Sequence, residues 1–518
     1  MGTTLEERDR GLYRFFKQVE RIGNRLPHPM WIFFYLIGIV MVLSLILSTM
    51  GVSVTYTQAD AKGNIEVIEA AVVNLFSKEQ IQNFFPSLIS EYASNPVLGN
   101  ALVIGMCMAL AEDTGFFDAF LRKALLRAPR SMTTLVLAFM GICANIAGDS
   151  GQILAATLGA VVFKAVGRNP WIGIVTGYAA ASAGYTANLL VANADVTLSS
   201  ITGSVAESLG YTGFHPLINW FFLVVATPIL AIVTTVIVEK FMTRLIGDYE
   251  TEEDDSGIQK YSLTENESRG LRFAAIGTGI YVALLLLATV PSNGVLRNEN
   301  GELLPKSPFI SSTVVFVALL FAIAGSCYGF GCRKFKNKND IPKMMQKGIG
   351  KVSGLLAMLL PVSMFITIFT ESNLATILSV KGQELLESIN LNGFPLFIVF
   401  ILFTTFINLF MNSGSAKWFI FAPIFVPMFA RMGIHPAMTQ LIYRIGDSCT
   451  NNIAPLNASM MVSLALMDQY KRDDQESPGI GTLMSYQLPF SIAYLITFIL
   501  QLAVFYFFNI PIGPGIIG

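Results

Sequence analysis

One side of a predicted helix in the apolar segment 437–466 carries charged and polar residues. These residues recur at spacings of three and four positions, which places them on one helical face: Arg444, Asp447, Ser448, Asn451 and Asn452. A guanidinium can hold a carboxylate through two parallel hydrogen bonds, so Arg444 is expected to bind an anionic substrate. Arg444 and Asp447 lie one turn apart, however, and could instead pair with each other.

Two other apolar stretches are interrupted by short polar runs, "NIAGDSGQ" at 145–152 and "NSGSAK" at 412–417. A turn between helices leaves carbonyl and N–H groups without partners, and with Ser, Asn and Asp side chains these groups form a cage of oxygen atoms that suits sodium. Glycine and serine could also serve only to let a buried turn pack tightly. The expected sodium ligands, including residues on the partner helices, are Asn145, Asp149, Ser150, Gly151, Ser182, Asn412, Ser413, Gly414, Asp447, Ser448, Asn451 and Asn452.

Asp195 is a carboxylate inside an apolar segment with no basic residue nearby in sequence, seven positions after Asn188 on the same helical face. Burial without a partner favours the protonated form of a carboxyl, so Asp195 is expected to take up and release protons. The alternative is that Asp195 caps a helix end near the outer surface. Asn188 is a candidate substrate contact.

Trp418 follows the second polar run directly and offers a flat face for an aromatic ligand. Tryptophan is also common as a core filler or as an anchor at the membrane interface. Lys417, beside it, could extend toward the membrane surface or help to attract an anion.

The composition requires lipid as the main solvent. Of 518 residues, 53% are hydrophobic and 13% charged, and the mean hydropathy is +0.58. The net charge of −1 gives no electrostatic footprint for nucleic acid, and the chain contains no P-loop motif for ATP. The three histidines, His28, His215 and His435, each precede a proline, which favours chain-entry turns over ligands.

About 20 apolar residues span a bilayer, and nine spans are predicted near 30–51, 97–114, 171–201, 217–240, 271–291, 309–331, 347–370, 437–466 and 484–509. The interrupted stretches 132–166 and 394–431 have arms too short to cross and are predicted to be re-entrant hairpins. The expected fold is therefore an all-α polytopic membrane protein. Its parts are a cytoplasmic N-terminus (1–29), a first span and outer loop (30–96), a first repeat (97–241), an acidic linker with two spans and a basic loop (242–346), and a second repeat (347–518).

Basic residues set the expected orientation. With the N-terminus in the cytoplasm, 26 of the 34 Lys and Arg residues fall on the inner side, as the positive-inside rule requires. The C-terminus is then outside. The basic N-terminus runs directly into a full-length span, which favours a retained anchor over a cleaved signal.

An internal repeat links the two halves. Segments 167–194 and 433–460 align at a constant offset, matching Gly167 with Gly433, Pro170 with Pro436 and Ser182 with Ser448. An odd number of spans separates the copies, so the second is predicted to be inverted. The polar tips are then expected to enter from opposite faces and to meet around a shared pocket, as in alternating-access transporters.

The motifs "AGDSGQ", "GYTANLLVANAD", "NSGSAKWFIFAPIFVPM" and "YRIGDSCTNNIAPLN", in this order, resemble those of the p-aminobenzoyl-glutamate transporter (AbgT) family. The resemblance implies a homodimeric inner-membrane secondary transporter for p-aminobenzoyl-glutamate, which carries one aromatic ring and two carboxylates. Some members export sulfonamide antimetabolites with the proton gradient. Functional positions of the family that match this sequence are Asp195, Ser415, Trp418, Arg444 and Pro455.

The expected function is ion-coupled transport of p-aminobenzoyl-glutamate and related aromatics, with H⁺ or Na⁺ as coupling ion and no cofactor except bound Na⁺. A sodium-coupled dicarboxylate carrier is the alternative within the same class. An intramembrane enzyme would need Asp149 and Asp447 side by side, yet they belong to opposite repeats, so no enzymatic activity is expected. A passive channel would need rings of repeated carbonyls or charges, which the sequence does not contain.

Overall fold

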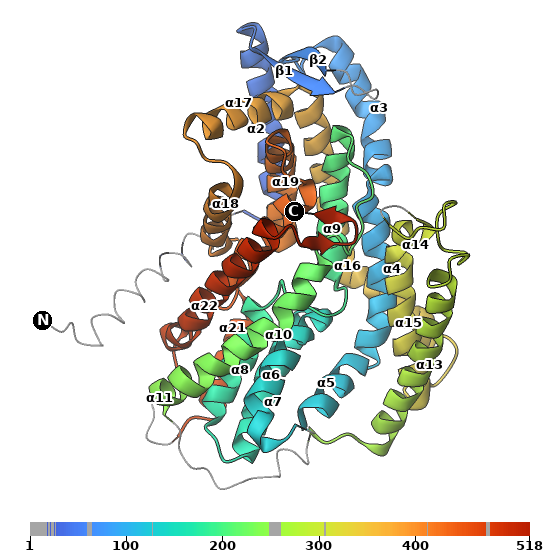
Figure 1. Ribbon diagram of the computed structural model, residues 1–518, viewed down its shortest axis with the longest axis vertical. Coiled ribbons are helices and arrows are strands. Elements are labelled where there is room, and N and C mark those ends of the chain that lie inside the picture. The colour runs from blue at the N-terminus through green and yellow to red at the C-terminus, as the bar shows by residue number, and fades with distance from the viewer. Residues whose placement is uncertain are drawn as a thin grey trace, which may run out of the picture.

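Helices make up almost the whole molecule, as the computed structural model in Figure 1 shows. The structure describes residues 18, 21, 25, 27–59, 65–126, 128–247, 261–304, 307–411, 413–472 and 477–517. Most of the predicted acidic linker falls outside these residues. Two short antiparallel β-hairpins interrupt the helical fold, β1 (Ser53–Ala59) with β2 (Ile65–Ala71) and β3 (Pro511–Gly513) with β4 (Ile516–Ile517).

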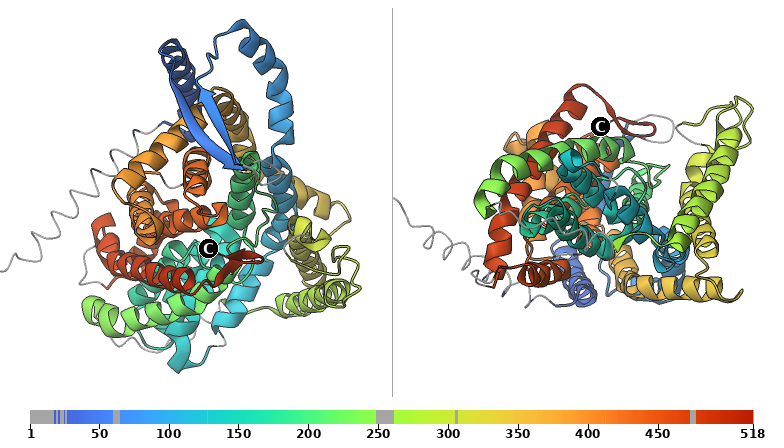
Figure 2. Two further views of the ribbon diagram at one scale, coloured as in Figure 1. Left: turned by 45° about the horizontal axis from the view of Figure 1, so that its top comes forward. Right: turned by 90° about the horizontal axis from the view of Figure 1, so that it is seen from below.

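Long apolar helices form the membrane-spanning part. They are α2 (Pro29–Thr49), α4 (Pro96–Asp113), α10 (Trp220–Ile237), α13 (Glu265–Thr289), α15 (Thr313–Gly331), α16 (Asp340–Glu371) and α22 (Ile480–Phe507). Each coincides with a predicted span. Figures 1 and 2 show that α13 and α15 stand together at one side of the molecule, where α15 also packs on α4. The prediction of an all-α polytopic membrane protein is confirmed.

Shorter elements connect these helices. They are α3 (Lys78–Ser94), α5 (Phe116–Leu126), α11 (Thr243–Ile246), α14 (Pro308–Ser311), α17 (Leu374–Ser388), the 3₁₀ turns η1 (Arg130–Met132) and η3 (Glu207–Leu209), and the π-helical turn η4 (Val238–Met242).

Two predicted spans are not continuous helices. Segment 171–201 is split into α8 (Pro170–Ala183) and α9 (Asn193–Ala206), and segment 437–466 into α20 (Pro436–Cys449) and α21 (Ala458–Gln469). Among the described residues, eight helices are long and apolar enough to cross a membrane, or nine if α17 and α18, bent by 115°, count as one. This count includes Arg130–Ala147, the first arm of the predicted hairpin 132–166, so that arm is not too short to cross by length and composition. The count omits both split helices, because neither half of a split helix is long enough alone.

The first hairpin consists of α6 (Thr133–Cys143), η2 (Ala144–Ala147) and α7 (Gly148–Ala165). Its tip is tight, since a Cβ on Gly151 would meet the Ala144 carbonyl oxygen at 1.9 Å. Its second arm lies close along α8, where Gly159 and Gly173 face each other. A Cβ on Gly159 would come within 2.2 Å of the Gly173 oxygen, so the two backbones are in direct contact.

The second hairpin consists of α18 (Gly393–Asn408) and α19 (Gly414–Arg431). Phenylalanines hold its arms together, with ring centroids 4.7 Å apart for Phe400 and Phe425 and 5.5 Å apart for Phe403 and Phe421. Both predicted hairpins are therefore present as helical hairpins. Each is followed by a split helix.

The split helices begin in the same way in both halves. Gly167 and Gly433 both have positive φ, +74° and +79°, and each is followed three residues later by the first proline of the helix. The residue before that proline caps the helix by accepting a hydrogen bond from the backbone N–H two positions on. The order hairpin then split helix thus occurs twice, in agreement with the predicted repeat.

Each histidine–proline pair forms the predicted entry turn. The Nδ1 atom of His28, His215 and His435 accepts a hydrogen bond from the backbone N–H two residues later, at 3.3, 3.2 and 3.1 Å. A histidine cap followed by proline thus begins α2 and α20. At His215 the same arrangement begins the turn that leads into α10.

The segment after the first span, which the sequence leaves uninterpreted, forms the β1–β2 ribbon. Figure 2 shows the ribbon standing over one end of the molecule beside α17. Two hydrogen bonds fasten its end to the corner between α16 and α17: Val73 N–H donates to the Ser372 carbonyl at 3.1 Å, and Asn373 Nδ2 donates to the Ala71 carbonyl at 2.8 Å.

Candidate functional site

The two unwound segments that split the helices, 184–192 and 450–457, lie where the repeats meet. Thr186 in the first break donates a hydrogen bond to the Arg444 carbonyl at 2.8 Å. Asn457, at the end of the second break, donates to Ser182 Oγ at 3.3 Å. These two hydrogen bonds join the first break to α20 and the second break to α8 of the opposite repeat.

Arg444 and Asp195 form an ion pair across this junction. Their charged atoms lie 2.6 Å apart, and the side chains are only 4% and 2% exposed. The Asp195 oxygen in this pair accepts no aligned hydrogen bond, so charge rather than directed bonding holds it. The description of Asp195 as an unpaired carboxylate is therefore wrong, because the fold supplies a partner from the other repeat. Arg444 pairs with Asp195 instead of Asp447.

Asp195 also caps a helix, as its alternative interpretation proposed. Its second oxygen accepts a hydrogen bond from the Ala192 N–H at 2.6 Å, at the start of α9. That helix end lies inside the molecule at the break, not at an outer surface, since Asp195 is 2% exposed. The carboxylate therefore both stabilises the broken end and neutralises Arg444.

Trp418 is fully buried, and both its indole N–H and its ring have partners within the protein. Its indole N–H donates to Thr202 Oγ1 at 2.9 Å, and its ring stacks on Tyr443 with centroids 4.4 Å apart. Thr202 in turn donates to Gln440 Oε1 at 2.5 Å. In this conformation Trp418 is a core residue that connects α9, α19 and α20, and Tyr443 covers one face of its ring.

Lys417 fills the position expected for a cation at the second hairpin tip. Its ammonium group lies 2.6 Å from an Asp447 oxygen, contacts Asn408 Oδ1, and has no exposed surface. The Tyr443 hydroxyl lies within hydrogen-bonding distance of both the same Asp447 oxygen and the Gly414 carbonyl, and its one proton is shared between them. The expectation that Lys417 extends toward the membrane surface is therefore wrong.

The other predicted sodium ligands of the second repeat already have protein partners. Ser413 caps α19 at Ala416, and Ser448 donates to the carbonyl of Ile445. Asn451 accepts from Asn408, while Asn452 donates to Gln487 and accepts from Ser491. Gly414 approaches Asp447 so closely that a Cβ would meet the carboxylate at 2.6 Å.

The first hairpin tip has unpaired acceptors instead. Asn145 Oδ1 and Gln152 Oε1 are buried with no hydrogen-bond partner, although Asn145 Nδ2 donates to Ile142. Ser150 is exposed and donates to Glu112 at 3.3 Å, beside the buried Gly151. Asn412 and the side chain of Asp149 lie outside the described part of the structure. Ser182 contacts Asn457 of the other repeat, as above.

The remaining candidates lie around the junction. Asn188 and Pro455 are buried within the two breaks, and the amide nitrogen of Asn188 has no partner. Ser415 is half-buried in the first turn of α19. A buried donor without a partner is costly, so Asn188 is suited to accept a ligand oxygen.

Sequence reasoning missed three residues around this junction, Gln440, Thr202 and Asn408. Gln440 lies one turn before Arg444 and extends the same polar face, so continuing the spacing backward would have found it. Thr202 follows Asp195 by seven positions and shares its face in the same way. Asn408 gave no signal, because its partner Lys417 is brought to it by the turn between α18 and α19.

Helical hairpins and broken helices arranged around buried charges are typical of secondary transporters. The chain belongs to the AbgT putative transporter family, whose model matches residues 14–517. It is thus a multi-pass membrane transport protein rather than an enzyme.

Relatives match along nearly the whole chain. The p-aminobenzoyl-glutamate transport protein of Escherichia coli (strain K12) is 33% identical over 504 residues, covering 97% of this chain and 96% of the relative. The structure of Neisseria gonorrhoeae MtrF, described as one of a class of antimetabolite efflux pumps, is 33% identical, covers 97% of this chain and all of its own, and has a TM-score of 0.89. The Alcanivorax borkumensis YdaH transporter is 29% identical over 94% of this chain and all of its own, with a TM-score of 0.86.

Proposed function

We propose that this protein is an ion-coupled secondary transporter of p-aminobenzoyl-glutamate and related folate-pathway aromatics, which also exports sulfonamides in exchange for protons. The observation that carries the proposal is the buried Arg444–Asp195 ion pair between the repeats. The name of the Escherichia coli relative supports the substrate, and the description of MtrF supports efflux.

Arg444 exchanges partners during transport in this proposal. A substrate carboxylate takes the place of Asp195 on the guanidinium, and the unpaired amide of Asn188 donates to a second substrate oxygen. Ser415, in the first turn of α19, and Pro455, in the second break, are proposed as further substrate contacts. The aromatic ring of the substrate contacts Trp418 after Tyr443 moves aside, since the two rings are stacked before binding.

Proton coupling follows from the same exchange. Once Arg444 is neutralised by substrate, Asp195 remains as a buried carboxylate without a counter-charge, and burial then favours its protonated form. Release of that proton restores the ion pair and expels the anion. Binding of the anionic substrate and protonation of Asp195 therefore favour each other through Arg444, which couples the two for movement in the same direction, whereas exchange of a sulfonamide for H⁺ requires that the sulfonamide bind when Asp195 is deprotonated.

Sodium fits one hairpin tip better than the other. At the second tip Lys417 already supplies a positive charge to Asp447 and Asn408, so these oxygens are not available to Na⁺. At the first tip the unpaired oxygens of Asn145 and Gln152 are suitable donors. We therefore propose H⁺ as the driving ion, with at most a structural Na⁺ at the first tip.

The remaining expectations are part of the same proposal. The protein is proposed to work as a homodimer in a bacterial inner membrane, with its N-terminus in the cytoplasm and its C-terminus outside. Analytical ultracentrifugation in detergent measures the oligomeric state directly.

Liposomes containing the purified protein test the function. A proton gradient imposed alone is expected to drive movement of labelled p-aminobenzoyl-glutamate and of a sulfonamide, and a sodium gradient alone is not. An Arg444→Ala variant in matched liposomes is the control. Transport driven only by sodium and inhibited by succinate rather than by sulfonamides would instead identify a dicarboxylate carrier.

A further inference from the structure

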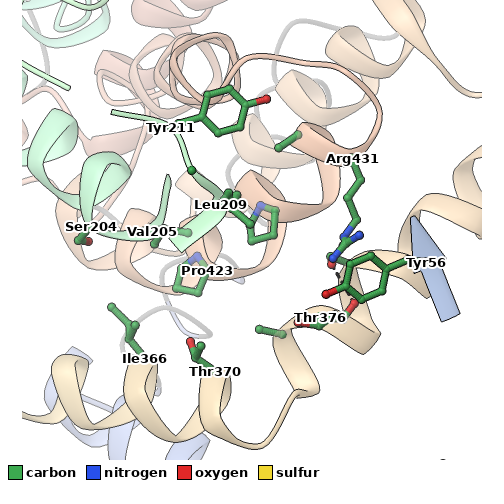
Figure 3. A pocket seen from close by; sticks show the side chains of 15 residues that line it. Tyr56, Ser204, Val205, Leu209, Tyr211, Ile366, Thr370, Thr376, Pro423 and Arg431 are labelled. Carbon is green, nitrogen blue, oxygen red and sulfur yellow. Dashed lines mark hydrogen bonds between the residues drawn. The ribbon is translucent and has the colours of Figure 1, made fainter. Parts of the chain in front are cut away.

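A cavity lies apart from the Arg444 junction, at the end of the molecule beside the β1–β2 ribbon. Its volume is about 650 Å³, within the range typical of small-molecule sites. Figure 3 shows side chains from separate parts of the chain around it, including Tyr56 of β1, Ser204 of α9, Thr376 of α17 and Arg431 of α19.

Arg431 is the one charged residue in the lining of this cavity. Its Nε donates to Ser379 Oγ at 3.0 Å, and its guanidinium carbon lies 4.0 Å from the centre of the Tyr56 ring. Among the described residues, no carboxylate lies within ion-pairing distance of it. A positive charge at the end of α19 also suits the helix dipole. A favourable interaction with the helix dipole, however, does not require the contact with Tyr56 or the hydrogen bond to Ser379, which together fix the plane of the guanidinium at the cavity wall.

Two helices that line the cavity, α9 and α19, also carry residues of the buried site. Pro423 and Pro427 of α19 form part of its wall, and each proline leaves the carbonyl four residues earlier without its helical donor. Pro423 is five residues from Trp418, a distance of roughly 7 Å along the helix. Ser204 likewise follows Thr202 on α9. The Trp418–Thr202 contact therefore separates the cavity from the Arg444 junction.

We infer that this cavity is a second binding site for an anionic aromatic molecule, in which Arg431 holds a carboxylate and Tyr56 lies against the ring. On the proposed route of the substrate, this site lies between the outer side of the protein and Arg444. The choice of p-aminobenzoyl-glutamate as its ligand rests on the proposed function, whereas the preference for an aromatic anion rests on Arg431 and Tyr56. Figure 1 shows α17 and the ribbon at the opposite end of the molecule from α5 and α11, so the site faces the side from which the second hairpin enters.

Charge selectivity at the cavity tests the inference without assuming a transported substrate. A Thr376→Cys variant is treated with two thiol reagents of similar size, one carrying a sulfonate and one neutral. The sulfonate reagent is expected to react at least several-fold faster relative to the neutral one, and Arg431→Gln is expected to remove this preference. Glu387→Cys, an exposed position farther along α17, is the matched control and should show no dependence on Arg431.

Ligand protection then identifies the occupant. Millimolar p-aminobenzoyl-glutamate should slow labelling of Thr376→Cys about tenfold, also in an Arg444→Ala background, and should not protect Glu387→Cys. A sulfonate preference that survives Arg431→Gln, or protection that requires Arg444, overturns the outer site. Charge preference together with an absence of transport in liposomes would refute the proposed function and leave the outer site standing.

Discussion

Among the individual residues, the main feature is two buried ion pairs, Arg444 with Asp195 and Lys417 with Asp447. A buried pair is seldom the most stable choice for a packed core, since apolar side chains of similar volume serve as well or better. Their presence therefore indicates a function that requires charge. The pairs differ in setting, because Arg444–Asp195 joins the two repeats whereas Lys417–Asp447 lies within the second.

Substitutions of Arg444 and Asp195 are expected to have different effects. Arg444→Ala should weaken substrate binding at the central site by at least tenfold, because the carboxylate loses its bidentate partner. The side chain of Asp195→Asn can still accept the hydrogen bond from the Ala192 N–H but cannot take up a proton. Substrate should therefore still bind, while transport no longer follows the proton gradient. Calorimetric binding and liposome flux measure the two properties separately. An Asp195→Asn protein that responds normally to the gradient would contradict the proton role.

The Lys417–Asp447 pair should show strong coupling in a double-mutant cycle. Lys417→Met and Asp447→Asn each leave an uncompensated buried charge, which costs about 3–5 kcal/mol in comparable cases. The double variant removes both charges and should be more stable than either single variant. Thermal unfolding in detergent measures all four proteins. Additive losses would mean that the two charges do not stabilise each other.

The polar face of α20 could be predicted from spacing alone, and so could Asp195 as an intramembrane carboxylate. The ion-pair partners of Arg444 and Asp195 could not be predicted in this way. Arg444 and Asp195 are 249 positions apart, and a helical period relates only neighbours on one helix. Asp447 was the nearest acid in sequence and the wrong partner for Arg444, because Lys417 reaches it from the hairpin tip.

At the scale of elements, close packing of small residues fixes the first hairpin on its split helix. Gly159 of α7 and Gly173 of α8 allow backbone contact that no larger residue permits. The second hairpin also lies close to its split helix, since a Cβ on Gly446 of α20 would come within 2.6 Å of the Ile401 carbonyl oxygen of α18. Large aromatic residues fill the space between the two arms of this hairpin.

Gly159→Ala should consequently destabilise the protein by about 1–3 kcal/mol, the usual cost of overpacking, and reduce transport. The added Cβ would come within 2.2 Å of the Gly173 carbonyl, so one of the helices has to move. Gly279→Ala on α13 is the control, because nothing lies within 4 Å of its Cβ position. Thermal unfolding in detergent compares the stability of the Gly159→Ala and Gly279→Ala variants. Equal stability of the two variants would rule out this contact as a constraint.

The hairpins and most spans could be predicted from apolar length and polar interruptions. The break in 171–201 could not, because "GYTANLLVANAD" contains no proline and its apolar residues continue through the unwound part. The break is stabilised by a tertiary hydrogen bond from Thr186 to the other repeat and by a local cap, in which Asp195 accepts from the Ala192 N–H three residues earlier. The break after α20 was signalled by Pro455.

At the scale of the whole molecule, the orientation in the membrane is the property that sequence charge predicts most directly. Lys338 lies in an exposed loop before α16, and Asn300 in an exposed loop before α14, at opposite ends of α15. With Lys338→Cys and Asn300→Cys, an impermeant thiol reagent applied to intact cells should label only the second. Labelling of the first requires disruption of the membrane. The reverse pattern would invert the topology.

The β1–β2 ribbon is joined to three helices, α16, α17 and α19. Its end is bonded to the α16–α17 corner, and Tyr56 in its first strand stacks on the last residue of α19. Any displacement of α19 relative to α16 and α17 would therefore also move or strain the ribbon. An antibody fragment that binds the ribbon is expected to restrain the second hairpin.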